Sequence, residues 1–169
     1  MSYFAAAATR VDDVWEAFEV DLDGVGDLDE VIDRMRELGS GASPVVMFVE
    51  ADDEYLVVLR LDDGDSLRVF GSDAPYASES RLGAVLLSDV DVETPGEVVD
   101  DDDDDSDTPV SSELDAQPVG EPDLLEDLDV SAALLLELCA KDGMLPSDVI
   151  AEVAGQMGCG DVMEEVHDA

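Results

Sequence analysis

The sequence has very few basic residues for its number of acidic ones. Lys and Arg together number 7 against 46 Asp and Glu, which gives a formal net charge of −39 over 169 residues. Binding to RNA, DNA or an anionic membrane depends on clustered Lys and Arg, and here the seven are scattered singly. The charge therefore argues against direct binding of nucleic acid or membrane. It would attract a basic protein partner, although solubility or adaptation to salt explains it equally well.

Long apolar runs and a basic N-terminal stretch are also missing. No uncharged run approaches the ~18 to 20 residues that span a bilayer, and the first residues lack the positive charge that begins a secretory signal. Hydrophobic residues nevertheless make up 46% of the chain, which is enough to build a core. We expect a soluble, cytoplasmic protein.

Residues that carry common active-site chemistry are scarce. The single histidine, His167, lies three residues from the end, where chains usually fray, whereas a general base needs fixed geometry. Cys139 and Cys159 are too far apart for a C-x-x-C pair, and we expect both to be free, buried thiols. Neither a phosphate-binding loop nor a dinucleotide fingerprint is present. The sequence thus predicts no catalytic residue, cofactor or metal site.

One segment resembles a calcium-binding loop. Asp21 to Asp29 places oxygen ligands at several of the required positions, but Val25 and Ile32 occupy two others that need oxygen. A strand-to-helix connection with Asp27 as the helix cap explains the same residues.

Pairs and runs of carboxylates offer a second possible chemistry. Adjacent aspartates could hold Mg²⁺ or perform acid–base catalysis, but 46 acids produce such pairs freely, and these fall at predicted turn tips. The run Asp100 to Asp105 could imitate a phosphate backbone, which requires charges held at regular spacing. Solvated turns and a flexible run are the alternative interpretation. The pairs are Asp12-Asp13, Asp52-Asp53 and Asp62-Asp63.

Charge and composition divide the chain into three parts. Residues 1–90 contain all six Arg, residues 91–122 contain 13 acids and no base, and residues 123–169 contain the single Lys. The middle part includes the six consecutive aspartates and four prolines, so it repels itself and has little apolar surface to bury. We predict an α+β domain at 1–90, an acidic disordered linker at 91–122 and a small helical bundle at 123–169.

Hydrophobic periodicity predicts a ββαβββα order in the first part. A hairpin is followed by a helix with an apolar stripe, three strands and a second helix capped by Ser72 or Asp73. This gives a mainly antiparallel, five-stranded sheet with two helices. The aromatic side chains of this part are expected mostly in its core. The predicted strands and first helix are Tyr3–Ala8, Val14–Val20, Leu28–Leu38, Val45–Glu50, Glu54–Leu61 and Leu67–Phe70.

The last part reads as three short helices. Ser131 can cap the first, Gly143 follows it, Pro146 begins the second and Asp161 can cap the third. About 45 residues make a marginal independent domain, so the unit either folds alone or docks on the sheet or on a partner.

Several longer strings resemble the bacterial family of tRNA adenosine deaminase-associated proteins. They lie in both predicted ordered parts and so span most of the chain. They are SYFAAA with Arg10 and Trp15, EVDL at Glu19–Leu22, PVVMFVEADDEYLVV at Pro44–Val58, RVFGSDA at Arg68–Ala74 and LLELCAKDGMLP at Leu135–Pro146.

The resemblance implies association with the enzyme that converts adenosine to inosine in a tRNA anticodon. The chain is not that deaminase, because it lacks the H-x-E and P-C-x-x-C segments that hold the catalytic zinc and its general acid–base. We predict a non-enzymatic acidic accessory protein whose partner is tRNA adenosine deaminase or another basic protein. The alternatives are a small carboxylate- or metal-dependent enzyme and an acidic adaptor unrelated to tRNA. No partner-binding residue is assigned by the sequence.

Overall fold

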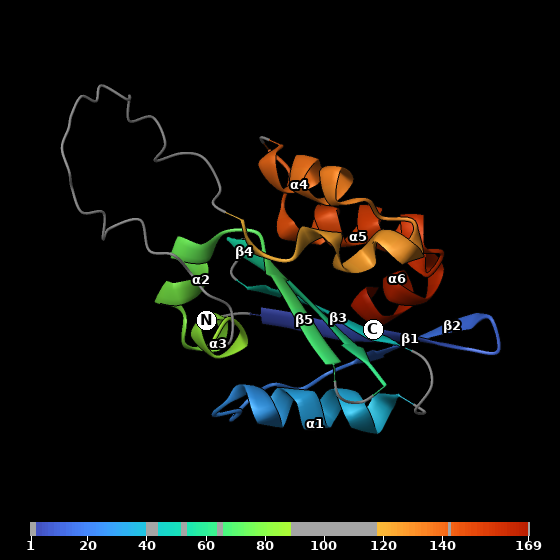
Figure 1. Cartoon of the computed structure of the whole chain (residues 1–169), viewed down its shortest axis with the longest axis horizontal. Coiled ribbons are helices and arrows are strands. Elements are labelled where there is room, and N and C mark those ends of the chain that lie inside the picture. Colours follow the sequence, from blue (N-terminus) through green and yellow to red (C-terminus); the bar gives the residue numbers. More distant parts are fainter. Residues whose placement is uncertain are drawn as a thin grey trace.

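A six-stranded sheet lies between two layers of helices (Figure 1). The computed structural model describes residues 3–39, 44–51, 54–63, 66–88, 118–141 and 143–168. The elements are β1 (Tyr3–Val11), β2 (Val14–Glu19), α1 (Leu28–Leu38), β3 (Val45–Ala51), β4 (Tyr55–Asp62), β5 (Ser66–Gly71), α2 (Ala74–Glu79), α3 (Arg81–Leu86), β6 (Val119–Gly120), the 3₁₀-helix η2 (Pro122–Leu128), α4 (Ala132–Ala140), α5 (Pro146–Met157) and α6 (Gly160–Asp168).

The sheet is antiparallel throughout, with strand order β2-β1-β3-β4-β5-β6. The mixed α+β class and the five predicted strands are confirmed, but the strand count was one too low. The sixth strand is only two residues long, and it comes from the predicted linker. It pairs with β5 through Phe70–Gly120 and Gly71–Val119, so side-chain periodicity could not have revealed it.

The β1–β2 hairpin turns through two aspartates. Asp12 and Asp13 have φ angles of 52° and 68°, the left-handed conformations that a two-residue hairpin turn requires. Aspartate tolerates this region better than most residues because its side chain is short and polar. The acidic pair here therefore has a structural role at a turn tip.

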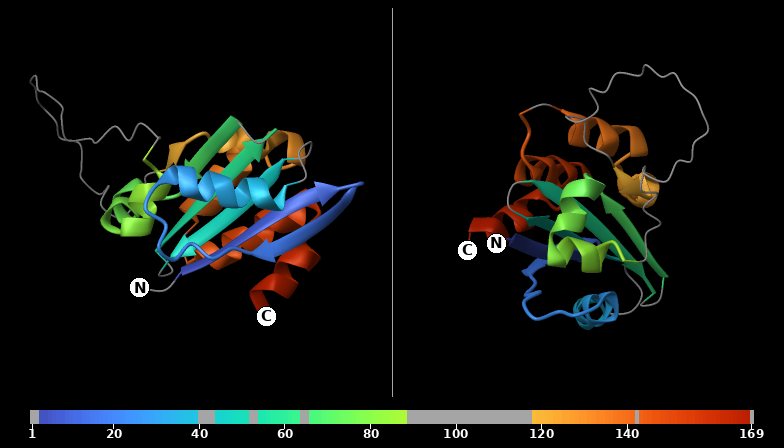
Figure 2. Two further views of the ribbon diagram at one scale, coloured as in Figure 1. Left: turned by 90° about the horizontal axis from the view of Figure 1, so that it is seen from below. Right: turned by 90° about the vertical axis from the view of Figure 1, so that its left-hand side faces the viewer.

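Helix α1 covers one face of the sheet, as Figure 2 shows from below. The side chain of Asp27 accepts a hydrogen bond from the Glu30 amide at 3.1 Å, which confirms the predicted cap. Val31 and Met35 on its inner side are fully buried against alternate residues of the strands.

The predicted second helix is in fact two short helices that meet at Ser80. The predicted cap Asp73 accepts from the Tyr76 amide at 3.5 Å, and Ser80 Oγ then accepts from the Gly83 amide at 3.1 Å to begin α3. A Cβ built on Gly83 would lie 2.1 Å from the Ala77 carbonyl oxygen. This close approach makes the corner between α2 and α3, and one uninterrupted helix could not provide it. The sequence predicted two helices in residues 1–90, whereas the structure has three, α1, α2 and α3.

The C-terminal helices η2, α5 and α6 pack on the opposite face of the sheet, and α4 packs on η2 and α5 (Figure 2). Their side chains form one core with alternate residues of β1, β3, β4 and β5. The C-terminal helices therefore dock on the sheet, because their side chains share its core. The Ser131 cap and the helix start at Pro146 are confirmed, whereas α6 begins at Gly160, so Asp161 lies in its first turn.

The proposed linker lies mostly outside the described residues, so its disorder and the three-part division of the chain stay predictions. Its last described residues, 118–121, lead through β6 into η2. Among the described helices, none is long and apolar enough to cross a membrane.

Candidate functional site

Carboxylates in and beside the calcium-like loop accept hydrogen bonds from neighbouring groups of the protein. A carboxylate oxygen of Asp21 accepts from the amide of Asp23 at 2.9 Å and from the hydroxyl of Tyr3 at 3.3 Å. The Glu30 carboxylate accepts from the Gly26 amide at 2.8 Å. These bonds hold the connection between β2 and α1. No group of three or more His, Cys, Asp or Glu with metal-site geometry occurs in the described ranges.

His167 is held within α6 and not in a frayed tail. Its ring stands edge-on to Phe4 of β1, with centroids 4.8 Å apart and planes at 73°. The two rings border a pocket of about 460 Å³ between β1, α5 and α6. Asp148 also lines this pocket, but its carboxylate accepts from the Leu145 amide at 3.2 Å and so caps α5.

Both cysteines are free, as predicted, but only Cys159 is fully buried, whereas Cys139 is partly exposed. Burial raises the pKa of the Cys139 thiol to about 12 and that of Cys159 to about 11. A thiol with such a pKa carries almost no thiolate at neutral pH, and the thiolate is the nucleophile. The arrangement suits packing and not covalent chemistry.

Among the described residues, the most buried charged side chain is that of Arg60 of β4, which is 6% exposed. Its guanidinium donates to both carboxylate oxygens of Asp127, to the backbone oxygen of Leu124 at 2.7 Å and to Asp62 at 3.2 Å. The hydrogen bond to Asp127 is the largest cause that raises the pKa of Arg60, and burial opposes it. All three nitrogens, and four of the five N–H donors, are engaged, so this cluster joins sheet to helix.

The carboxylate pair Asp62-Asp63 also has a structural role. Asp62 is bonded to Arg60, and Asp63 turns the chain with a φ of 54°. Asp52 and Asp53 lie outside the described residues, as does the run Asp100–Asp105. Of the three pairs singled out in the sequence, the two that the structure describes therefore have structural roles at turns.

An apolar groove lies along β2, the outermost strand of the sheet, and against α6. It has a volume of about 420 Å³ and opens to solvent. Trp15 and Ala17 supply its floor from the strand, and Val162 and Val166 supply its wall from the helix. The indole of Trp15 lies close to Gly158, where an added Cβ would be 3.6 Å from the indole nitrogen.

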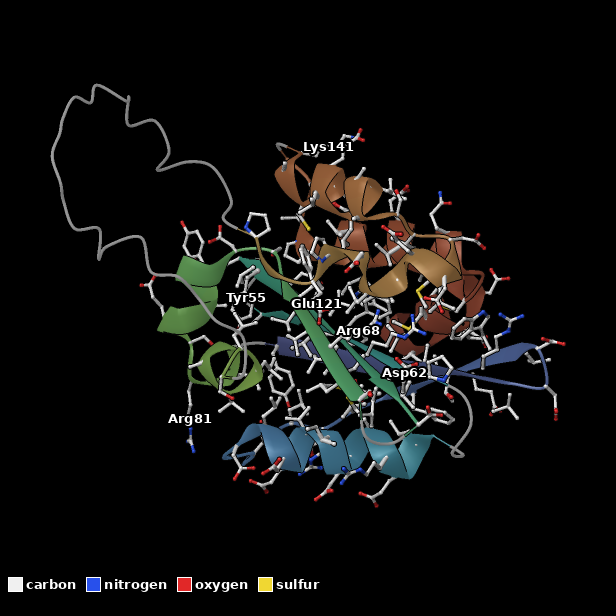
Figure 3. The ribbon with its side chains drawn as sticks, viewed as in Figure 1. Tyr55, Asp62, Arg68, Arg81, Glu121 and Lys141 are labelled. Atoms are coloured by element: carbon white, nitrogen blue, oxygen red, sulfur yellow. The ribbon has the colours of Figure 1, made fainter. Side chains whose placement is uncertain are left out.

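Carboxylates surround this groove. Glu16, Glu19 and Glu165 belong to its lining, and the first two are exposed on β2. Lys141 and Arg81 lie at the periphery well away from the hairpin (Figure 3). Among the described residues this is a surface that combines apolar area with negative charge, as a basic protein partner would require.

Local sequence patterns did not predict this surface. Phe18 was expected mostly in the core, but it is 38% exposed, and Val14 on the same side of β2 is 62% exposed. Both face the α1 side of the sheet, where α1 packs mainly on β1, β3 and β4. Only the strand order makes β2 an edge, and no local pattern encodes that order.

Comparison with known proteins supports the family resemblance seen in the sequence. A family model described as Rv3753c-like tRNA adenosine deaminase-associated protein matches residues 3–160, which include the sheet, α1 to α5 and the groove strand β2. No curated protein and no solved structure is significantly similar to the chain. Because the family model spans nearly all of the chain, the protein belongs to the Rv3753c-like tRNA adenosine deaminase-associated family.

Proposed function

We propose that this protein is a non-catalytic accessory protein that binds tRNA adenosine deaminase in the cytoplasm. Membership of a family described as deaminase-associated is the observation that carries the proposal. The net charge of −39 and the acidic groove along β2 support it, because they favour a basic protein as partner.

Electrostatics explains why such a pair would form. An enzyme that binds tRNA needs a basic surface to neutralise phosphates. A strongly acidic protein is attracted to that surface and repelled by tRNA itself, so it can steer assembly of the enzyme or compete with tRNA. Both roles need no chemistry in the accessory protein.

Titration of the full chain into purified deaminase from the same genome tests this proposal. We expect a complex at low ionic strength that weakens as salt shortens the Debye length from ~10 Å at 0.1 M to ~3 Å at 1 M. Isothermal calorimetry gives the affinity at each salt concentration. Absence of a complex at low salt would remove the proposal.

Two controls separate accessory binding from other activities. The chain alone should neither retain tRNA in a mobility-shift assay nor form inosine in an anticodon stem-loop. Inosine formation by the deaminase, measured with and without the chain, then tells whether binding activates the enzyme or competes with its substrate. Tight binding of bare tRNA by the chain would contradict the electrostatic argument.

A further inference from the structure

The two edges of the sheet differ in how the chain closes them. At one edge β6 pairs with β5, the Glu121 amide donates to the Val69 carbonyl at 2.9 Å, and the chain continues into η2. At the other edge no described residue pairs with the outer side of β2, which is six residues long. Unpaired edge groups are a template on which another strand can form.

The hydrogen-bond ladder determines which groups of β2 point outward. The Val20 amide donates to the Ala5 carbonyl at 2.9 Å, so this is a hydrogen-bonded pair. Such pairs recur at every second residue of an antiparallel ladder. On β2 they fall at Val14, Glu16 and Phe18. The backbone groups that face away from the sheet are therefore those of Trp15, Ala17 and Glu19.

Those same outward positions border the groove against α6. The Trp15 and Ala17 side chains lie on the helix side of the sheet, where Val162 and Val166 complete an apolar wall. A strand added beside β2 would place alternate side chains in this groove. A single extended segment could therefore hydrogen-bond to the β2 backbone and bury its side chains in the groove.

The residue pattern of β2 combines the charged side chains of a protected edge with exposed apolar ones. Native edge strands are commonly kept from pairing by charged side chains or by a bulge. Here Glu16 stands between Val14 and Phe18, which are 62% and 38% exposed, and the six residues pair with β1 in continuous register. The edge therefore keeps apolar contact area that a solvated edge does not need.

Charge selects the kind of strand that can occupy this edge. Glu16, Glu19 and Glu165 border it, and the nearby Arg10 is paired with Asp13 at 3.1 Å. A second copy of the chain would oppose like charges across the new pairing. Residues 91–122, with 13 acids and no base, would be repelled in the same way.

We propose that the outer edge of β2 binds an extended segment of the partner protein that alternates basic and apolar residues, as a further strand of the sheet. Lys or Arg on one face of that segment would lie beside Glu16, and an apolar side chain on the other face would enter the groove beside Trp15. This inference deepens the proposed function and takes from it only the identity of the partner.

A short synthetic peptide tests the edge directly. The probe is a nine-residue peptide of alternating Lys and Val with blocked ends, added to the full chain, and the matched control peptide has Glu in place of Lys. Trp15 is the only tryptophan, so its fluorescence reports binding at the groove. We expect saturable change with the Lys peptide and none with the Glu peptide.

Amide hydrogen exchange identifies the binding mode. In the complex, exchange at Trp15, Ala17 and Glu19 should slow by about tenfold or more, whereas Glu16 and Phe18 already bond to β1 and should change little. Slowing without this alternation would overturn the proposal in favour of non-specific attraction. Equal protection of all five amides in the free chain would also overturn it, because the edge would then be occupied by the chain itself or by a second copy.

Variants test the backbone and the charge separately. Ala17→Pro removes an outward donor, and the double variant Glu16→Lys with Glu19→Lys reverses the charge without altering the backbone. Each should weaken peptide binding by about tenfold or more. The control, Glu126→Lys with Glu137→Lys, makes the same charge change at exposed positions of η2 and α4 and should cost less than about threefold through long-range charge alone. Equal losses in both double variants would refute a specific site.

The same variants applied to the deaminase titration distinguish the two proposals. If the wild-type chain binds the enzyme and the β2 variants bind equally well, the edge proposal fails and the accessory function stands. If the wild-type chain does not bind the enzyme but pairs with the peptide, the accessory function fails and the edge stands as a site for another basic protein.

Discussion

Arg60 of β4 and Asp127 of η2 are 67 positions apart in the sequence, yet they form a two-pronged ion pair that joins the sheet to its C-terminal helices. The second prong, from the other terminal nitrogen of Arg60, measures 2.9 Å. Arg60 is the only buried charged residue among those described, and the pair lies beside the core that the two segments share. Docking of the helices is therefore fixed in place by a directional contact as well as by apolar burial.

Replacing Asp127 by Asn should weaken this junction. Arg60 would keep Asp62 and the Leu124 oxygen but lose its charge-assisted partner, a type of bond worth about 1.5–3 kcal/mol. Asp127 is 63% exposed, so solvent screening reduces the expected loss to about 1–2 kcal/mol. Urea unfolding measures it. Asp33→Asn, which breaks the exposed pair with Arg36, is the matched control and should cost no more than about 0.5 kcal/mol.

The difference in stability between the wild type and Asp127→Asn should disappear in acid. The hydrogen bond from Arg60 is the main cause that holds the pKa of Asp127 below its ordinary value. A carboxylate with a lowered folded pKa stabilises the protein above its unfolded pKa of about 3.9, and the contribution is lost as pH falls through the folded value. The difference should be constant from about pH 5 to 7 and shrink below about pH 4.

Comparing the two proteins at each pH cancels the change in overall charge. Many other carboxylates titrate in the same range, and relief of their repulsion alters the absolute stability of both proteins alike. A difference that stays constant down to about pH 2 would show that the stability lost in Asp127→Asn does not come from the ionised carboxylate.

Two glycine-to-alanine changes should have opposite signs. Gly155 lies inside α5, and a Cβ there meets nothing within 4 Å in the described part of the chain. Gly155→Ala should therefore stabilise by about 0.5–1 kcal/mol through helix propensity. At Gly120 of β6 the φ angle is +93°, and a Cβ would lie 2.1 Å from the Val69 oxygen. Gly120→Ala should destabilise by more than about 1 kcal/mol.

Thermal unfolding of both variants checks this pair of predictions. Loss of stability in Gly155→Ala would mean that a neighbour outside the described ranges fills the space beside it. An unchanged melting temperature in Gly120→Ala would mean that β6 does not contribute to the stability of the fold.

Most of the fold follows from local signals in the sequence. Helix α1 combines the Asp27 cap with an apolar stripe, and β3 and β4 are long β-rich runs between turn residues, so their presence was predictable. The corner at Ser80 was not, because it depends on contact between Gly83 and Ala77.

The missed features all depend on contacts between distant segments. Strand β6 is defined by its pairing with β5. Helix η2 is held by a hydrogen bond from Arg60, and nothing near Arg60 in the sequence distinguishes it from the other arginines. The groove beside Trp15 was missed for the same reason, since it exists only because α6 packs against β2. The acidic character of the residues around the groove does follow from composition, because 46 of the 169 residues are Asp or Glu.

Both thiols should react slowly in the folded protein. With the pKa of Cys159 raised to about 11 and a side chain only 1% exposed, thiolate at pH 8 is scarce and shielded. Cys139 has its pKa raised further, to about 12, also by burial. Ellman's reagent at pH 8 should therefore label the native chain at least about a hundredfold more slowly than the chain in guanidinium chloride, where the ordinary thiol pKa of about 8.5 returns. Rapid labelling of Cys139 alone would instead show that α4 opens locally from α5 and η2.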